Sequence, residues 1–163
     1  MGQDREQGLA ARLATAADAA AIAALVRLAF STQSRPTDPP PGALRETPGS
    51  IAHELARGGG AVVERAGALV GAVLWVEEDR SLHVGRLSVH PAHRRRGIAR
   101  RLMDEAEREA RRRGLARLHL GVRLVLEDNR RLFAACGFVE TTRHAHEGFS
   151  EPTWVRMERR LDG

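Results

Sequence analysis

The stretch from Ser81 to Arg113 constrains the fold of this chain more than any other part of the sequence. A hydrophobic, strand-like run ends at Pro91, because proline lacks the N–H that a strand ladder requires. A basic turn follows, and after Gly97 the apolar residues recur at helical spacing, at Ile98, Leu102, Met103, Ala106 and Ala110. The segment therefore predicts a strand that runs through an arginine–glycine turn into an amphipathic helix.

The rest of the sequence supplies strands and helices on both sides of this segment. Upstream we predict a strand at 9–13, a helix at 18–30, a Pro-rich loop at 31–48, a helix at 49–57 ended by three glycines at 58–60, and strands at 61–65 and 68–78. Downstream we predict a half-buried strand at 117–122, a helix at 127–136, and strands at 138–142 and 154–160. The order β-α-α-β-β-β-α-β-α-β-β predicts a mixed α/β fold, with a central mixed sheet flanked by helices.

Length and composition limit the class of protein. A chain of 163 residues predicts one domain, spanning 1–163. No apolar run reaches the ~18 residues of a membrane span, and the polar start at 1–8 lacks the apolar stretch of a signal peptide. We therefore expect a cytoplasmic protein with no membrane contact. The single cysteine, Cys136, excludes an internal disulfide and a multi-cysteine metal site.

The turn before the predicted helix has the features of a phosphate-binding site. The first N–H groups of a helix lack intrahelical partners and carry a partial positive charge. Gly97 lets an anion approach the backbone closely, and Arg94, Arg95, Arg96 and Arg100 can grip phosphate. Neither a Walker A sequence nor a dinucleotide-binding glycine pattern is present. A solvated arginine run is the alternative, but the strand and proline before the turn and the helix after it favour phosphate.

This segment resembles the signature of the GNAT superfamily of N-acetyltransferases. That signature is a hydrophobic strand, then Gln or Arg, two residues, Gly, one residue, Gly or Ala, and a helix; here it reads Arg94-x-x-Gly97-x-Ala99. The resemblance implies the GNAT fold and direct transfer of the acetyl group of acetyl-CoA to a primary amine. It also implies that the turn holds the pyrophosphate and that the strand main chain binds the pantetheine arm. The implied cofactor-binding residues are Leu87, Ser88, Val89, Arg94, Arg95, Arg96, Gly97, Ile98, Ala99 and Arg100.

A second resemblance lies in the segment from Asn129 to Phe138. It is similar to the family's helix with an asparagine, an aromatic residue and a closing Gly-Phe, although the asparagine stands closer to the aromatic than is usual. Both spacings keep the pair on one helix face, so Asn129 and Phe133 join the implied cofactor site. Phe133 replaces a frequent tyrosine that is often proposed to protonate the CoA thiolate, and phenylalanine has no proton to give. Because a thiol with a pKa near ~8.5 leaves without an acid, this predicts a slower enzyme or another proton donor.

An amine that attacks a thioester must lose a proton, so a general base is required. Glu77 and Glu78 end the strand beside the cofactor strand, and one of them should face the open side because strand side chains alternate. The alternative is a pair of solvated carboxylates beside the Asp79-Arg80 turn. His83, on the cofactor strand, is the third candidate base, with a surface histidine as its alternative. The N–H of Val89 is a candidate to polarise the thioester carbonyl.

Several weaker features remain open. His144, His146 and Glu147 suggest a metal site, but without a third ligand cluster we expect none and prefer a role near the acceptor. Cys136 is either an acyl nucleophile or, as we expect, a small buried residue. The Pro-rich loop 31–48 is expected to cover the acceptor side, where Asp38 or Glu46 could attract an amine.

Two other functions compete with acetyl transfer. The formal charge of +5 and the clusters at 94–96, 111–113 and 130–131 suggest nucleic-acid binding, but aromatic residues make up only 4% of the chain, too few for a base-stacking surface. A non-catalytic acyl-CoA sensor is favoured by Phe133. The acceptor, a small molecule or a peptide amine, cannot be identified from the sequence, and the family resemblance implies a homodimer.

Overall fold

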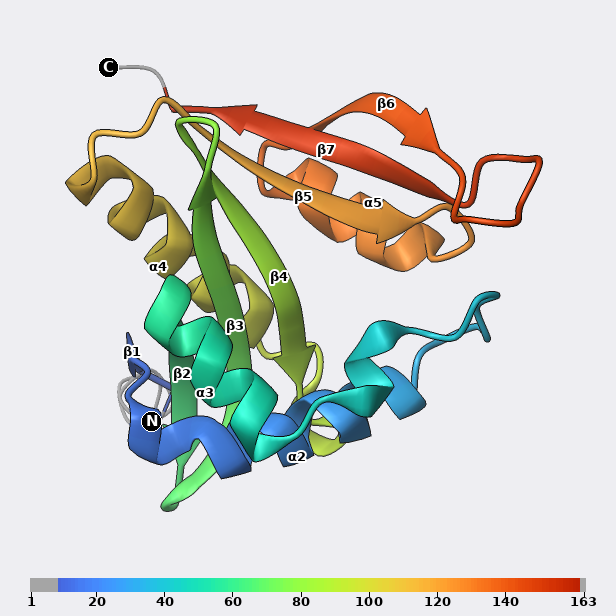
Figure 1. The fold of residues 1–163 in the computed structure, drawn as a ribbon. Helices are drawn as coiled ribbons and strands as arrows, with labels where there is room; N and C mark the ends of the chain where they lie inside the picture. The colour runs from blue at the N-terminus through green and yellow to red at the C-terminus, as the bar shows by residue number, and fades with distance from the viewer. Residues whose placement is uncertain (1–8, 162–163) are drawn as a thin grey trace.

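A computed structural model describes residues 9–161, which form a mixed seven-stranded sheet covered by helices (Figure 1). Residues 1–8 and 162–163 lie outside the described range. The expectation that the chain starts without a signal peptide concerns residues 1–8. The strands are β1 Ala11–Leu13, β2 Gly59–Arg65, β3 Ala68–Glu78, β4 Ser81–Val89, β5 Arg117–Arg123, β6 Val139–His144 and β7 Trp154–Arg160. The helices are α2 Ala19–Ser31, α3 Pro48–Arg57, α4 Ile98–Arg112 and α5 Glu127–Ala135, with short 3-10 turns η1 Ala16–Asp18, η2 Gly42–Arg45 and η3 Pro91–His93. The predicted order of elements is confirmed.

The sheet has the order β1-β2-β3-β4-β5-β7-β6, and in it β4 and β5 are the parallel neighbours, connected by the crossover helix α4. Their ladder is short: it pairs Ser81 with Arg117, Leu82 with Leu118 and His83 with His119. Beyond the last pair β4 and β5 diverge, as Figure 1 shows. We call this divergence, between residues 84–89 of β4 and 120–123 of β5, the fork.

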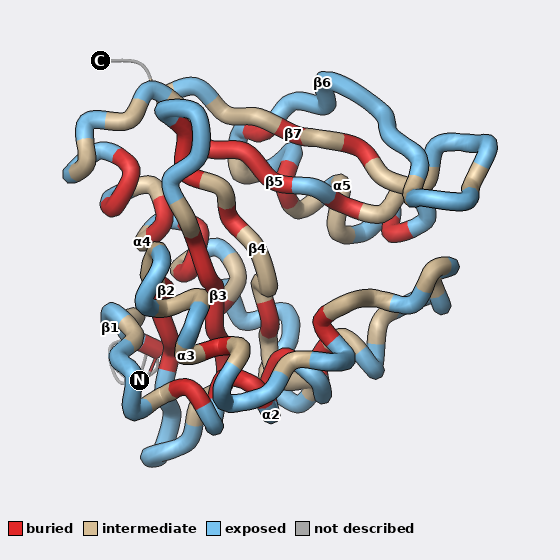
Figure 2. The backbone as a smooth tube through the Cα atoms, viewed as in Figure 1, coloured by how far each residue is buried: buried red, intermediate tan, exposed pale blue. Residues whose placement is uncertain are grey.

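Each face of the sheet has its own hydrophobic core (Figure 2). On one face, the predicted apolar positions of α4 are all buried, with Ile98 at 1% and Leu102 at 0% exposure. Gly71 makes this close contact possible, because a Cβ there would stand 2.5 Å from Cγ2 of Ile98. The other face is covered by α2 and α3, whose Val26 and Ile51 are fully buried. Helices therefore hold both sides of the central strands, and the fork opens at their end.

Two predictions about local structure are wrong. The predicted helix does end at Arg57 with Gly58 as its C-cap, but Gly59 and Gly60, assigned to the same helix end, already belong to β2. Gly60 packs closely there, since a Cβ would lie 2.4 Å from the carbonyl oxygen of Val73 on the neighbouring strand. The strand β5 is also not half-buried at its centre. His119, assigned to its polar side, is only 3% exposed because Ser81 and His83 of β4 pack against it. None of the helices within residues 9–161 combines the length and apolar character needed to span a membrane.

Candidate active site

The β4 side of the fork presents free main-chain groups. Residues 84–89 have no ladder partner on β5, and the chain at Arg86 has a positive φ of 53°, where the β3–β4 register shifts. Leu87 and Val89 are half-buried on the α4 face. Ser88 is 2% exposed, and its Oγ donates to the carbonyl oxygen of Arg86 at 2.9 Å. Main-chain groups of successive strand residues alternate between the two edges, and the N–H of His90 faces β3, where it donates to Val70. The main chain of Val89 and Leu87 therefore faces the open edge and can bind a ligand, whereas Ser88 faces β3 and its hydroxyl is engaged inside the fold.

The arginine–glycine turn joins the end of β4 to α4. Gly97 caps the helix in the left-handed conformation, at φ 79° and ψ 11°, and Arg95 also has a positive φ of 63°. Alternating backbone conformations of this kind turn successive N–H groups toward a common anion. Within residues 9–161, no turn or loop hydrogen bond takes its donor from the N–H groups of residues 94–100. The turn thus has the free donors and open backbone that an anion site requires.

Only some of the turn's side chains are free for an anion. The guanidinium of Arg94 donates to Oγ1 of Thr32 at 2.9 Å and to the carbonyl oxygens of Thr32 and Ala29 at 3.2 and 3.4 Å. Arg94 therefore anchors the C-terminus of α2, so part of its hydrogen-bonding capacity is used within the fold. The exposed Arg95 and Arg96 make no hydrogen bond or ion pair with any described residue.

The first turn of α4 contributes mainly backbone. The side chain of Ile98 is 1% exposed and belongs to the core, so only its N–H can reach a ligand. Ala99 is half-buried. Arg100 donates from Nη2 to the carbonyl oxygen of Ala135 at 3.1 Å and so connects α4 to α5. Like Arg94, Arg100 has a structural partner, which the sequence analysis did not foresee.

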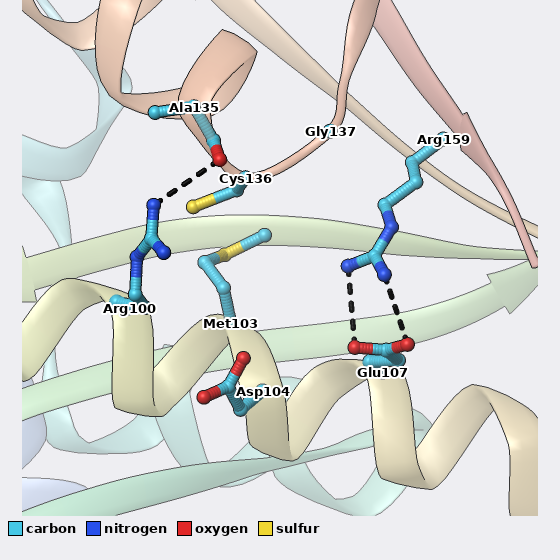
Figure 3. A pocket seen from close by; sticks show the side chains of 8 residues that line it. All are labelled: Arg100, Met103, Asp104, Glu107, Ala135, Cys136, Gly137 and Arg159. Atoms are coloured by element: carbon cyan, nitrogen blue, oxygen red, sulfur yellow. Dashed lines mark hydrogen bonds and ion pairs between the residues drawn. The ribbon is translucent and has the colours of Figure 1, made fainter.

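A pocket of about 330 Å³ lies between α4, α5 and β7 (Figure 3). The Arg100–Ala135 contact crosses it at one end. At the other end Arg159 makes a two-point ion pair with Glu107, at 3.2 and 2.9 Å. Cys136 lines the pocket and is half-buried, so it is more accessible than predicted. Burial raises the pKa of its thiol, which keeps the sulfur protonated and argues against an acyl nucleophile.

The aromatic position of α5 belongs to the core. Phe133 is 8% exposed, and its ring meets that of Phe138 edge to face, with centroids 6.1 Å apart. The ring of Phe133 therefore packs in the core. Asn129 stands one helical turn earlier and is half-buried. The position that often holds a tyrosine hydroxyl thus offers a hydrocarbon ring.

A buried cluster of Ser81, His83 and His119 stands where the fork begins. Oγ of Ser81 lies 2.6 Å from Nδ1 of His119, and the rings of His119 and His83 are 5.0 Å apart. Burial is the main cause that lowers the pKa of His119 to about 4 and that lowers the pKa of His83 below its ordinary 6.5. Sequence reasoning found His83 but missed the other two, because it could not align β4 with β5.

The two candidate glutamates lie on opposite faces of the sheet. Glu77 pairs with Leu82, whose side chain belongs to the α4 face, so Glu77 points away from His83. The structure therefore does not bring Glu77 to the cluster. Glu78 pairs with Ser81 and shares its face. Glu78 is exposed, and its charge acts to raise the pKa values of His83 and His119 against the larger effect of burial.

The Pro-rich loop 31–48 is attached to both sides of the fork. On the β4 side, Nη2 of Arg86 lies 3.3 Å from Oε1 of Glu46. On the β5 side, Nη1 of Arg123 donates to the carbonyl oxygen of Pro39 at 2.7 Å. The loop thus lies across the fork on the α2 face, and Glu46 is paired with Arg86 rather than free to attract an amine.

The C-terminal histidines have other partners. His144 stacks on Trp154, with ring centroids 4.4 Å apart, and the backbone N–H of His146 donates to Oγ1 of Thr153 at 3.0 Å. Within residues 9–161, no group of three or more His, Cys, Asp and Glu side chains is placed to hold a metal ion.

Most of the arginine clusters are neutralised by nearby carboxylates. Arg111 pairs with Glu107 at 3.0 Å, Arg113 with Glu109 at 2.7 Å, and Arg130 with Glu140 at 2.6 Å. Paired arginines offer little charge to a phosphate backbone. The positive charge of these clusters that has no carboxylate partner among residues 9–161 is thereby concentrated at Arg94, Arg95 and Arg96, in the turn before α4.

Comparison with known proteins gives a family match and a fold match. A model of the acetyltransferase (GNAT) family matches residues 22–138. PaiA N-acetyltransferase from Thermoplasma acidophilum, solved in complex with coenzyme A, is similar with a TM-score of 0.77 at 15% identity, over 94% of this chain and 99% of that chain. YncA from Salmonella typhimurium, solved with its cofactor acetyl-CoA, gives 0.71 at 23% identity, over 95% of each chain. Ribosomal-protein-alanine N-acetyltransferase from Brucella melitensis gives 0.74 at 22% identity, over 94% of this chain and all of that chain (100%). No curated protein matches the sequence significantly.

Proposed function

Because the chain belongs to the GNAT acetyltransferase family, we propose that it transfers the acetyl group of acetyl-CoA directly to a primary amine of a small molecule or peptide. One observation carries the proposal. A strand with an unpaired edge leads into a turn of free N–H groups at a helix start, and both border the same fork. A cofactor with an extended amide-containing arm and a pyrophosphate needs both features: the unpaired strand edge to hydrogen-bond the arm and the anion site to bind the pyrophosphate.

In this proposal the cofactor lies along β4 with its pyrophosphate at the start of α4. The N–H groups of residues 94–100 bind the phosphates, Gly97 leaves room for them, and Arg95 and Arg96 supply the charge. The pantetheine arm runs along Leu87, Ser88 and Val89 and is bound by the main chain of Leu87 and Val89, which faces the open edge of β4. The thioester then lies near α5, where Asn129 and Phe133 stand on one helix face.

The chemistry requires orientation and two proton transfers. Holding the amine against the thioester supplies much of the rate, and a main-chain N–H on the open edge of β4 is proposed to polarise the carbonyl. With His83 as the base this N–H must lie close to His83, whereas the sequence candidate Val89 stands six residues, about 20 Å of extended strand, further along β4. Phe133 has no hydroxyl, so water protonates the thiolate, whose pKa of ~8.5 makes it a competent leaving group. His83 is the favoured base because it stands at the fork, with Glu78 on the same face as the second candidate.

A non-catalytic acyl-CoA sensor is the alternative that a specific observation favours, because Phe133 lacks the usual proton donor. Nucleic-acid binding is not favoured, since acidic partners neutralise Arg111, Arg113 and Arg130. A cytoplasmic location and a homodimer are part of the proposal and are supported by the family resemblance. Light scattering of the purified chain tests the dimer.

The test has two steps. Acetyl-CoA at about 100 times its Kd stabilises a protein by about 2.7 kcal/mol, or roughly 5–11 °C in Tm for a chain of this size. No shift at about 1 mM, the upper end of ordinary KM values, contradicts both CoA functions. Thiol release in the presence of an amine panel then separates the enzyme from the sensor.

A further inference from the structure

The hydroxyl of Ser81 has two acceptors within reach, the carbonyl oxygen of Arg117 at 3.2 Å and Nδ1 of His119 at 2.6 Å. Either way, Ser81 holds the His119 ring through Nδ1. If the single hydroxyl proton goes to Arg117, Nδ1 of His119 carries a proton and donates it to Oγ. Nε2 of His119 is then an unprotonated acceptor.

The cluster is rigid on one side and open on the other. Ser81 and His119 are 0% and 3% exposed, so they cannot change partners without disturbing the core. His83 is half-buried and rests on the ring of His119 at 5.0 Å, with the planes inclined by 41°. Because His83 and His119 form the last pair before β4 and β5 diverge, the exposed part of the His83 ring stands at the base of the fork.

We propose that Ser81 and His119 are positioning residues that hold the His83 imidazole at the fork, where it takes a proton from the acceptor ammonium. This inference rests on the proposed acetyl transfer. The N–C bond forms as the C–S bond of the thioester breaks. Of the two protons that the ammonium nitrogen loses, His83 passes one to solvent and the other ends on the CoA thiolate, so the reaction releases one net proton.

Charged groups from four elements surround the two histidines. Arg156 of β7 and Arg86 of β4 act to lower the pKa of His83, whereas Glu78 of β3 and Glu54 of α3 act to raise it. For His119, Arg156 and His83 act downward and Glu78 and Glu158 act upward. Burial outweighs all of these for both rings. A neutral His83 is therefore available as a base at neutral pH.

The experiment is the pH dependence of kcat/KM with a primary amine that gives turnover. If His83 is the base, activity rises to a plateau through a limb below pH 6.5. Arg156→Gln moves this limb to higher pH, and Glu78→Gln moves it to lower pH, because the two charges act on His83 in opposite directions. The proposal is overturned if log kcat/KM rises with unit slope against pH up to the pKa of the amine and if Arg156→Gln and Glu78→Gln have the same pH profile as the wild type.

Substitutions separate the base from the residues that position it. His83→Gln is expected to lower kcat about 10²-fold or more, and Ser81→Ala roughly 2- to 10-fold, the value of one neutral hydrogen bond. His119→Asn retains a donor toward Ser81 and should lose less activity than His119→Phe. His53→Gln, at an exposed position on α3, is the control and should match the wild type. Equal activity of His83→Gln and the control overturns the proposal.

A second measurement needs no acceptor. Nitrogen-15 NMR of the histidine rings should show His119 titrating with a pKa of about 4. Titration of His119 near 6.5 overturns the positioning role, because it would mean that the ring is not held in the buried cluster. A failure of the proposed function gives a different result: acetyl-CoA then does not stabilise the wild type, while the NMR signals of His119 are as predicted.

Discussion

Gly97 offers a substitution that should weaken cofactor binding without breaking the fold. Its φ of 79° costs a side chain about 1–2 kcal/mol, but a Cβ there meets no atom within 4 Å. Because a domain has about 5–15 kcal/mol of stability, Gly97→Glu should remain folded. Its carboxylate would then stand where we place the pyrophosphate.

The loss of affinity follows from charge repulsion. Two unit charges about 4 Å apart repel by about 1 kcal/mol in water and about 4 kcal/mol near a protein surface. Each factor of ten in Kd corresponds to about 1.4 kcal/mol. Acetyl-CoA should therefore bind roughly fivefold to 10³-fold more weakly to Gly97→Glu, measured by isothermal titration calorimetry.

Gly114 provides a matched control at the opposite end of the same helix. Its φ of 70° is similar, and its Cβ also meets no atom within 4 Å. Gly114→Glu thus introduces the same charge and comparable strain far from the turn. Gly97→Ala adds the strain without the charge and should lose less affinity than Gly97→Glu. Wild-type affinity in a folded Gly97→Glu variant would refute the placement of the pyrophosphate.

Three further predictions concern stability, each measured by urea unfolding. Gly71→Ala should cost about 1–3 kcal/mol, because its Cβ would overlap Ile98; an unchanged midpoint refutes the close packing of α4 on β3. Phe133→Ala should cost about 3–5 kcal/mol as a large-to-small core substitution, and a smaller loss would mean that the ring is not part of the core. Hydrogen bonds from Arg112 and Arg113 lower the pKa of Glu109 below 4.5. The ionised carboxylate therefore stabilises the folded protein fully above pH 4.5, and this contribution is lost as the pH falls through the lowered pKa. The deficit of Glu109→Gln should accordingly disappear in acid, and a deficit independent of pH contradicts the ion-pair explanation.

The parts of the fold that depend on local chemistry could be predicted from the sequence. Ala66-Gly67 and Asp79-Arg80 are two-residue turns with positive φ at all four positions, as hairpins require. Pro91 ends β4, and Gly97 begins α4, at the predicted places. In each case a single residue restricts the backbone, whatever packs around it.

The parts that depend on distant strands could not be predicted. The ladder between β4 and β5 stops at His83 and His119, and nothing near either residue encodes that end point. The burial of His119 was missed for the same reason. The hydrogen bonds of Arg94 were not predicted because its partner, Thr32, caps a helix far away in the sequence. Local sequence patterns predict where the turn lies. Which of its arginines have no partner can be seen only from the tertiary contacts.

The most direct test of the account is a screen of primary amines with acetyl-CoA that follows free thiol and identifies the product by mass spectrometry. We predict that at least one amine yields equal amounts of CoA thiol and N-acetyl product. At an acetyl-CoA concentration below the Kd, product formation should be reduced at least about fivefold in Gly97→Glu and retained in Gly114→Glu. If acetyl-CoA at about 1 mM neither stabilises the wild-type chain nor is consumed with any amine, the fork is not an acetyl-transfer site.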